Sequence, residues 1–307
     1  MVKFNKKATS VQEQIDLLTQ RGMIISDRRD AAHYLQFISY YRFSGYFFHF
    51  QKRDGSDQNN AFLPDITFQK IVNIYVFDRE LRLLVMDAVE RIEVAFRTQL
   101  INVMCEKLGP HWFMDSRHFV NYNHSDLLHK LDEIVRDYAD CKRRGRPKGE
   151  LFIDHYAEKY ADPKYPPCWM LAEVLSLQTW SVIYSKLKYR DCQKSVAGAF
   201  GVSNEVLSSW LHCLTYLRNL CAHHSRLWRR IFTIKPMKAM AYENQFRDNR
   251  KFYAQAVILF VLLRRVAPKT EWHQRMADLM SKYPDICIQD IGFPPHWQAD
   301  LFWGLKR

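Results

Sequence analysis

With 307 residues, of which 48% are hydrophobic, the chain is long enough to bury a substantial core in one large domain or two smaller ones, and this composition excludes an intrinsically disordered protein. Lys and Arg outnumber Asp and Glu by 45 to 33, which gives a formal net charge of +12. Such a positive field favours binding to a polyanion, nucleic acid above all, although it could also serve solubility alone.

Cysteine spacing and hydropathy indicate the compartment. The seven cysteines form no Cys-x-x-Cys pair and are odd in number, which argues against a zinc ribbon and against a disulfide framework. The basic N-terminus is followed by the polar residues 12–14, where a signal peptide needs apolar ones. The longest apolar segment, residues 252–263, is shorter than the roughly 20 residues of a membrane span and predicts a buried helix. We expect a cytoplasmic protein without a membrane partner.

The predicted elements are helices throughout, and they begin near the N-terminus. A helix over residues 11–21 ends at Gly22, and a second begins after Ser26 or Asp27, either of which can cap it. The aromatic block of residues 40–50 could stack on nucleobases, but rings of this size most often form core, which we expect here. Residues 51–65 are rich in Asp, Asn, Gly, Ser and Pro and predict a loop with a first internal boundary.

The strongest periodic signal is a long helix that starts at Thr67 and ends at Gly109-Pro110, with apolar residues three and four apart. Its charged residues predict a salt-bridged exposed face, although some could line a cleft: Arg79, Glu80, Arg82, Asp87, Glu90, Arg91, Glu93 and Arg97. A further helix is predicted over residues 125–142. The basic turn after it is either a solvated loop or an RNA-backbone contact through Lys142, Arg143, Arg144 and Arg146.

The second half of the chain continues the helical pattern. After Pro166-Pro167, one helix is predicted from Trp169 towards Leu187. Its Glu173 lies among apolar residues, and could either pin an arginine such as Arg218 or stay partly exposed at a helix edge. A helix that includes residues 206–217 and another over residues 246–265 follow, before a tail rich in Pro and Trp.

Residues 217–226, Leu-Arg-Asn-Leu-Cys-Ala-His-His-Ser-Arg, are the most informative segment. Arg218 offers a planar, permanently charged fork that matches phosphate oxygens. Histidine, the type of residue at position 223, has an unperturbed pKa of about 6.5 and can both accept and donate a proton near neutrality. Such a pair could cut RNA without a metal. Taken alone, the Arg-x-x-x-x-His spacing is a weak signal, because Arg and His also cap helix ends.

Several separated blocks in this order resemble the bacterial abortive-infection proteins of the AbiD/AbiF type, the Abi-like family of the HEPN superfamily. The blocks are residues 14–22, 40–46, 77–82 with 91–93, 167–180 and 217–228. The resemblance implies an all-α fold, a HEPN-like helical bundle over residues 61–266. An N-terminal helical region, residues 1–60, precedes the bundle, and a C-terminal extension rich in Pro and Trp, residues 267–307, follows it.

The resemblance also implies a metal-independent RNA endonuclease in phage defence, often the toxin of a toxin–antitoxin pair, which dimerises so that two Arg-x-x-x-x-His motifs face one cleft. Arg218 and His223 are then the catalytic pair, with Asn219 as their polar neighbour and Glu173 in support. The expected partners are RNA, as substrate and as a possible regulatory noncoding RNA, a second copy and an antitoxin; no cofactor is expected. The RNA contacts would be Lys142, Arg143, Arg144, Arg146, His224, Arg226 and Arg229.

Two positions depart from the family pattern, and two other functions stay open. Leu177-Gln178 stands where relatives commonly have an aromatic-Gly pair, and Arg229-Arg230 where Asn-Arg is common, which bears on the subgroup rather than on activity.

One alternative function is that of a non-catalytic helical module that binds RNA or protein. The other is a metal-dependent phosphohydrolase using His223, His224 and nearby carboxylates, which no His-x-x-x-His or His-Asp pairing supports.

Overall fold

The computed structural model describes residue 3 and residues 7–52, 60–143 and 150–305, with the side chains of residues 137–143 left out of the description. Over these residues the secondary structure is helical, and β-type pairing is limited to isolated bridges such as Ile24 with Thr67. The predicted all-α fold is therefore confirmed. No described helix combines the length and the apolar character that crossing a membrane requires.

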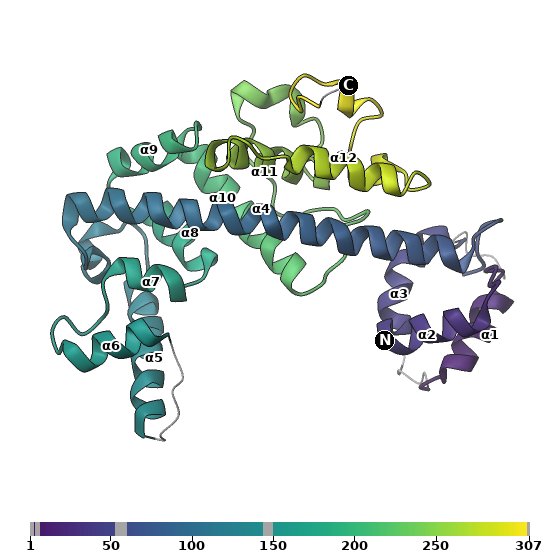
Figure 1. The fold of residues 1–307 in the computed structure, drawn as a ribbon, viewed down its shortest axis with the longest axis horizontal. Coiled ribbons are helices and arrows are strands. Elements are labelled where there is room, and N and C mark those ends of the chain that lie inside the picture. Colours follow the sequence, from purple (N-terminus) through teal and green to yellow (C-terminus); the bar gives the residue numbers. More distant parts are fainter. Residues whose placement is uncertain (1–2, 4–6, 53–59, 144–149, 306–307) are drawn as a thin grey trace.

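Helix α4, Phe68–Leu108, runs across the whole molecule and organises the fold (Figure 1). Its 41 residues correspond to a length of about 60 Å. The Thr67 hydroxyl caps the start by accepting the Lys70 amide at 3.1 Å, and Gly109 ends the helix with φ of 81°. Both ends were predicted from the sequence, because capping residues act locally.

Helices α1 (Val11–Gln20), α2 (Arg28–Ile38) and α3 (Tyr40–Phe47) lie at the N-terminal end of α4 (Figure 1). The Asp27 carboxylate caps α2, as predicted, by accepting the amides of residues 29 and 30 at 2.8 and 2.9 Å. The aromatic block is largely core, because Phe43, Tyr46 and Phe47 are buried. Tyr41 and Phe48 are the exceptions, with 90% and 44% of their surface exposed.

The segment after α4 builds the opposite end of the molecule. It contains α5 (His124–Arg143), α6 (Leu151–Lys159), α7 (Cys168–Val174), α8 (Leu177–Lys186) and α9 (Arg190–Ala199). The prediction of one helix from Trp169 towards Leu187 was wrong. Leu175 is extended, with ψ of 141°, and the Ser176 hydroxyl starts α8 by accepting the Thr179 amide at 3.3 Å.

Helix α10 (Asn204–Ala222) passes beside α4, and α11 (Phe252–Val266) and α12 (Trp272–Lys282) cover another face of it (Figure 1). Residues 252–263 are all buried, which confirms the predicted buried helix. The helix expected from Phe246 begins only at Phe252, after a turn in which Phe246 is itself buried. In the C-terminal tail, Trp303 is buried and stacks on Phe260 with ring centroids 5.0 Å apart.

The charged residues of α4 do not form one exposed face, so that prediction was partly wrong. Arg79, Glu90 and Arg91 are exposed, but Arg82 is only 5% exposed. Glu93 and Arg97 form an ion pair whose side chains are 14% and 16% exposed. Three of these predicted charged groups, Arg82, Glu93 and Arg97, are therefore turned towards the neighbours of α4, and they lead to the candidate site.

Candidate functional site

The Arg218-to-His223 segment forms the last turn of α10. The Ser203 hydroxyl caps the start of this helix, and its apolar residues, among them Trp210, Leu214 and Leu217, are buried. Arg218 and Asn219 follow in half-buried positions, and Arg218 Nη1 donates to Asn219 Oδ1 at 3.4 Å. His223 is the C-cap residue and its side chain is exposed. A rigid helix thus presents Arg218 and His223 near the protein surface.

The chain reverses directly after His223 in a closed helix end. The amide of His224 donates to the carbonyl of Cys221 at 3.0 Å, and the amide of Ser225 donates to the carbonyl of Leu220 at 2.8 Å. This pair of bonds is a Schellman motif, in which the residue at the His224 position adopts a left-handed conformation. His224 has φ of 55°, a region that glycine enters more easily than histidine. Contacts from elsewhere in the fold hold it there.

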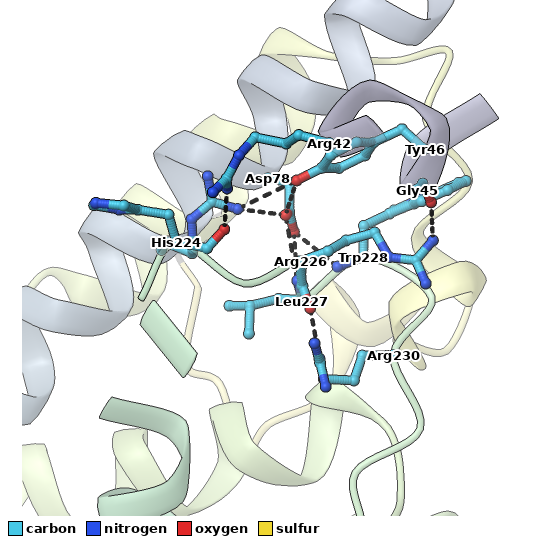
Figure 2. Close-up of polar contacts among 10 residues, drawn as sticks. Arg42, Gly45, Tyr46, Asp78, His224, Arg226, Leu227, Trp228 and Arg230 are labelled. Atoms are coloured by element: carbon cyan, nitrogen blue, oxygen red, sulfur yellow. Dashed lines mark hydrogen bonds and ion pairs between the residues drawn. The ribbon is translucent and has the colours of Figure 1, made fainter. Parts of the chain in front are cut away.

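One of these contacts comes from α3. Arg42 Nη1 donates to the carbonyl oxygen of His224 at 2.8 Å, across 182 residues of sequence. Figure 2 shows this bond and the His224 ring, which points away from the buried cluster beside it. The His224 backbone therefore closes the turn, while its imidazole is free to face solvent.

The rest of the turn is held by Asp78 of α4, whose side chain is 0% exposed. Its carboxylate accepts the amides of Leu227 at 3.1 Å and Trp228 at 2.7 Å, the Tyr46 hydroxyl at 2.8 Å and Arg82 Nη1 at 2.5 Å (Figure 2). Burial raises the pKa of the Asp78 carboxyl, and the Arg82 charge acts against that rise. Burial and the Asp78 charge raise the pKa of Tyr46, so its hydroxyl remains a donor. We call these residues the Asp78 cluster.

The arginines that follow the motif are bonded within the chain. Arg226 Nη1 donates to the Gly45 carbonyl and to His49 Nε2, the latter at 2.6 Å, and burial lowers the pKa of this guanidinium. Arg229 Nε lies 2.8 Å from Asp290 Oδ1, and its guanidinium carbon is 5.1 Å from the centre of the Trp228 ring. Both side chains, predicted as RNA contacts, already have partners that fix the turn.

On the other side of Arg218 lie charges from α4 and α7. Arg97 of α4 is paired with Glu93, and its Nε is buried without a hydrogen-bond partner among the described residues. Burial lowers the pKa of Arg97, the charge of Glu173 raises it, and the charge of Arg218 lowers it again. Glu173 and Arg218 are therefore each close enough for their charges to act on Arg97. Glu173 is exposed, and no ion pair between it and Arg218 occurs in the described part of the structure.

The basic turn after α5 falls largely outside the described residues. Lys142 and Arg143 belong to the last turn of α5, but their side chains lie outside the described residues, as do Arg144 and Arg146 entirely. Their predicted contact with RNA stays a prediction. The residues brought together around the motif are instead Arg218, Asn219, His223, His224, Arg42, Arg97 and the Asp78 cluster.

The chemistry available at this site is that of charge stabilisation and proton transfer. Arg218, with Arg97 near it, supplies positive charge on the helix end that also carries the exposed imidazole of His223. Across the described ranges, no three His, Cys, Asp or Glu side chains gather in a group that could hold a metal ion. The alternative of a metal-dependent phosphohydrolase therefore has no ligand cluster in its support there.

The comparison with protein families gives one finding. The model of the family described as Abi-like protein matches residues 33–229. This span includes α3, Asp78 and the whole motif turn up to Arg229. No curated protein and no solved structure matches the chain.

Proposed function

Since the chain belongs to the Abi-like family, as its sequence blocks predicted, we propose that it is a metal-independent RNA endonuclease of abortive infection. The observation that carries this proposal is the pairing of Arg218, half-buried among charged neighbours, with the exposed His223 on one rigid helix end. Groups that move protons must reach the substrate, whereas groups that stabilise charge act best where water is partly excluded.

The proposed reaction is transesterification within the RNA strand. The imidazole of His223 in one copy takes the proton of a ribose 2′-hydroxyl, whose oxygen attacks the neighbouring phosphorus. The bond from phosphorus to the 5′-oxygen breaks, and the protonated imidazole of the second copy's His223 returns a proton to that oxygen. The products are a 2′,3′-cyclic phosphate and a 5′-hydroxyl. Because the 2′-hydroxyl is the nucleophile, DNA is not a substrate.

Arg218 stabilises the charge that gathers on the phosphorane, which is often the largest single contribution to such catalysis. Asn219 accepts a hydrogen bond from Arg218 and so orients the guanidinium. The Asp78 cluster and Arg42 keep the following turn in the conformation that presents His223. Arg97 adds positive charge beside Arg218, and Glu173 balances part of it.

We further propose that the active form is a homodimer in which two motifs share one cleft, and that an antitoxin, either a protein or a noncoding RNA, restrains the enzyme as a toxin. The test is expression of the wild type, Arg218→Ala and His223→Ala in a bacterial host. The proposal expects growth arrest and RNA fragments with cyclic phosphate ends from the wild type alone. Growth arrest by all three proteins would favour the alternative of a non-catalytic binding module.

A further inference from the structure

Three aromatic side chains on the outside of the N-terminal helices do not join the core that their neighbours form. Phe37 is 71% exposed, Tyr41 90% and Phe48 44%. Among the other aromatic side chains of the described residues, Tyr160 and Trp169 are also exposed, by 47% and 49%, and they lie at the other end of the fold. Exposed aromatic surface is therefore concentrated around α3, which is also the helix that contacts the motif turn.

Tyr41, Gly45 and Phe48 follow one another along one side of α3, because residues three and four apart are neighbours on a helix surface. Gly45 has no side chain, and the space where a Cβ atom would stand is open. Gly45 therefore leaves a stretch of bare helix surface one turn after Tyr41. Since the Tyr41 ring is itself exposed, a flat group has room to stack on it.

Arg42, the neighbour of Tyr41 on α3, carries a positive charge and contacts the motif turn. Arg42 donates to the His224 carbonyl at 2.8 Å, and His49 accepts from Arg226 at 2.6 Å. Arginine has five N–H donors, so the single bond to His224 leaves Arg42 further donors for a ligand. The exposed aromatic row thus lies beside the Arg42 guanidinium, which contacts the backbone directly after His223.

We propose that Tyr41 and Arg42, with the open surface at Gly45, form a binding subsite for one unpaired nucleotide of an RNA strand. The base stacks on the Tyr41 ring and the adjoining phosphate is bound by Arg42. The inference rests on the proposed function, since it names where the substrate strand is held next to the cutting site. Stacking on aromatic rings with backbone contacts to arginine is how proteins bind single strands without reading their sequence.

Charge favours RNA over a second copy of this chain on the same surface. A symmetric interface through α3 would bring the Arg42 and Arg226 region of one copy close to the same region of the other. The like charges of the two guanidinium groups would repel across such an interface. A polyanion is complementary to this surface, whereas a second copy is not.

The test measures binding separately from cleavage. The probe is a labelled single-stranded RNA oligonucleotide methylated at every 2′-oxygen, which has no nucleophile and cannot be cut, and the readout is fluorescence anisotropy with the full-length protein. Tyr41→Ala is expected to weaken binding roughly 5- to 100-fold, the usual effect of removing one stacking ring. Tyr41→Phe, which keeps the ring, binds like the wild type. Tyr160→Ala removes an exposed ring at the other end of the fold and also binds like the wild type.

Each outcome decides the inference independently of the nuclease proposal. Because Tyr41 is exposed, its variants keep the thermal unfolding midpoint of the wild type. Unchanged binding by Tyr41→Ala, while the wild type still cuts ordinary RNA, overturns the subsite and leaves the nuclease standing. Ring-dependent binding without any cutting supports the subsite and overturns the nuclease. Lost binding that coincides with dissociation of a dimer in sedimentation overturns the subsite and assigns the surface to a second copy.

Discussion

Replacing Asp78 with asparagine tests whether the buried carboxylate holds the motif turn. Asn has nearly the same volume but carries no charge, and one of its two polar atoms is a donor. In the wild type that side chain accepts four donors, from Arg82, Tyr46 and the amides of Leu227 and Trp228. Asp78→Asn therefore turns a donor towards other donors and leaves the Arg82 charge buried without its partner.

The expected loss of stability is large, because the Asp78–Arg82 ion pair is almost fully buried. The side chain of Arg82 is 6% exposed and that of Asp78 is 0% exposed. Breaking a buried ion pair by removing one partner costs about 3–5 kcal/mol of unfolding free energy. For a chain of this size that corresponds to a fall in Tm of roughly 5–8 °C. Urea unfolding followed by circular dichroism measures the free energy directly.

Asp87→Asn is the matched control, because it makes the same change on the same helix at a half-buried carboxylate. Asp87 lies 3.0 Å from Arg91 and 2.8 Å from Arg275, and it is 30% exposed, so its replacement is expected to cost about 0–1 kcal/mol. Hydrogen exchange adds a local readout: in Asp78→Asn the amides of Leu227 and Trp228 exchange faster. Equal stability of the two variants, within about 1 kcal/mol, would refute the role of the Asp78 cluster.

Four further outcomes are expected. His223→Ala and Arg218→Ala each lower RNA cleavage by about 10²–10⁴-fold. His223→Ala keeps the wild-type unfolding midpoint, because the His223 side chain is exposed. A His223→Ala protein with full cleavage activity would contradict the assigned role. A chelator leaves cleavage unchanged, and chelator-sensitive cleavage would favour a metal-dependent hydrolase instead. The unfolding free energy of His224→Gly stays within about 1 kcal/mol of the wild type, because glycine adopts the φ of 55° found at this position. His224→Val is less stable, since a branched side chain does not fit that backbone conformation. Equal unfolding free energies for the two variants would argue against the strained turn. Arg226→Lys loses the planar guanidinium that binds the Gly45 carbonyl, and its unfolding free energy in urea falls by about 1–2 kcal/mol. An unchanged urea midpoint would mean that this contact is dispensable.

Features governed by neighbouring residues could be predicted from the sequence. The ends of α4 follow from Thr67 and Gly109, and the start of α2 follows from Asp27, because each of these residues acts on backbone groups a few positions away. The break between α7 and α8 escaped prediction. Ser176 caps the second helix, but in the sequence it lies within an apolar run that continues a helical pattern on both sides.

Features that depend on distant contacts could not be derived in the same way. Arg218 and His223 stand out by their chemistry, but the residue that holds the turn behind them, Asp78, is 149 positions away from Leu227. One signal for it does exist in the sequence. Asp78 falls between Ile74 and Leu81, at helical spacing within the buried face of α4, where a carboxylate needs a partner.

Charge alone gave no basis for separating arginines that face solvent from those that bind other groups of the protein. Arg226 and Arg229 follow the motif and were predicted as RNA contacts. In the fold Arg226 donates to the Gly45 carbonyl and Arg229 pairs with Asp290, and their contact with RNA stays a prediction. Arg42 drew no attention in the sequence, because nothing in residues 40–50 reveals that the His224 carbonyl lies within its reach. Such pairings are set by tertiary packing rather than by local pattern.

The most direct measurement is the end chemistry of RNA treated with purified protein in the presence of a chelator. The substrates are a single-stranded RNA and the DNA of the same sequence, incubated with the wild type and with His223→Ala. We expect the wild type to cut the RNA and leave 2′,3′-cyclic phosphate and 5′-hydroxyl ends, with the DNA intact and His223→Ala inactive. Cutting of the DNA, equal cutting of the RNA by His223→Ala, or intact RNA with the wild type would contradict the role assigned to Arg218 and His223.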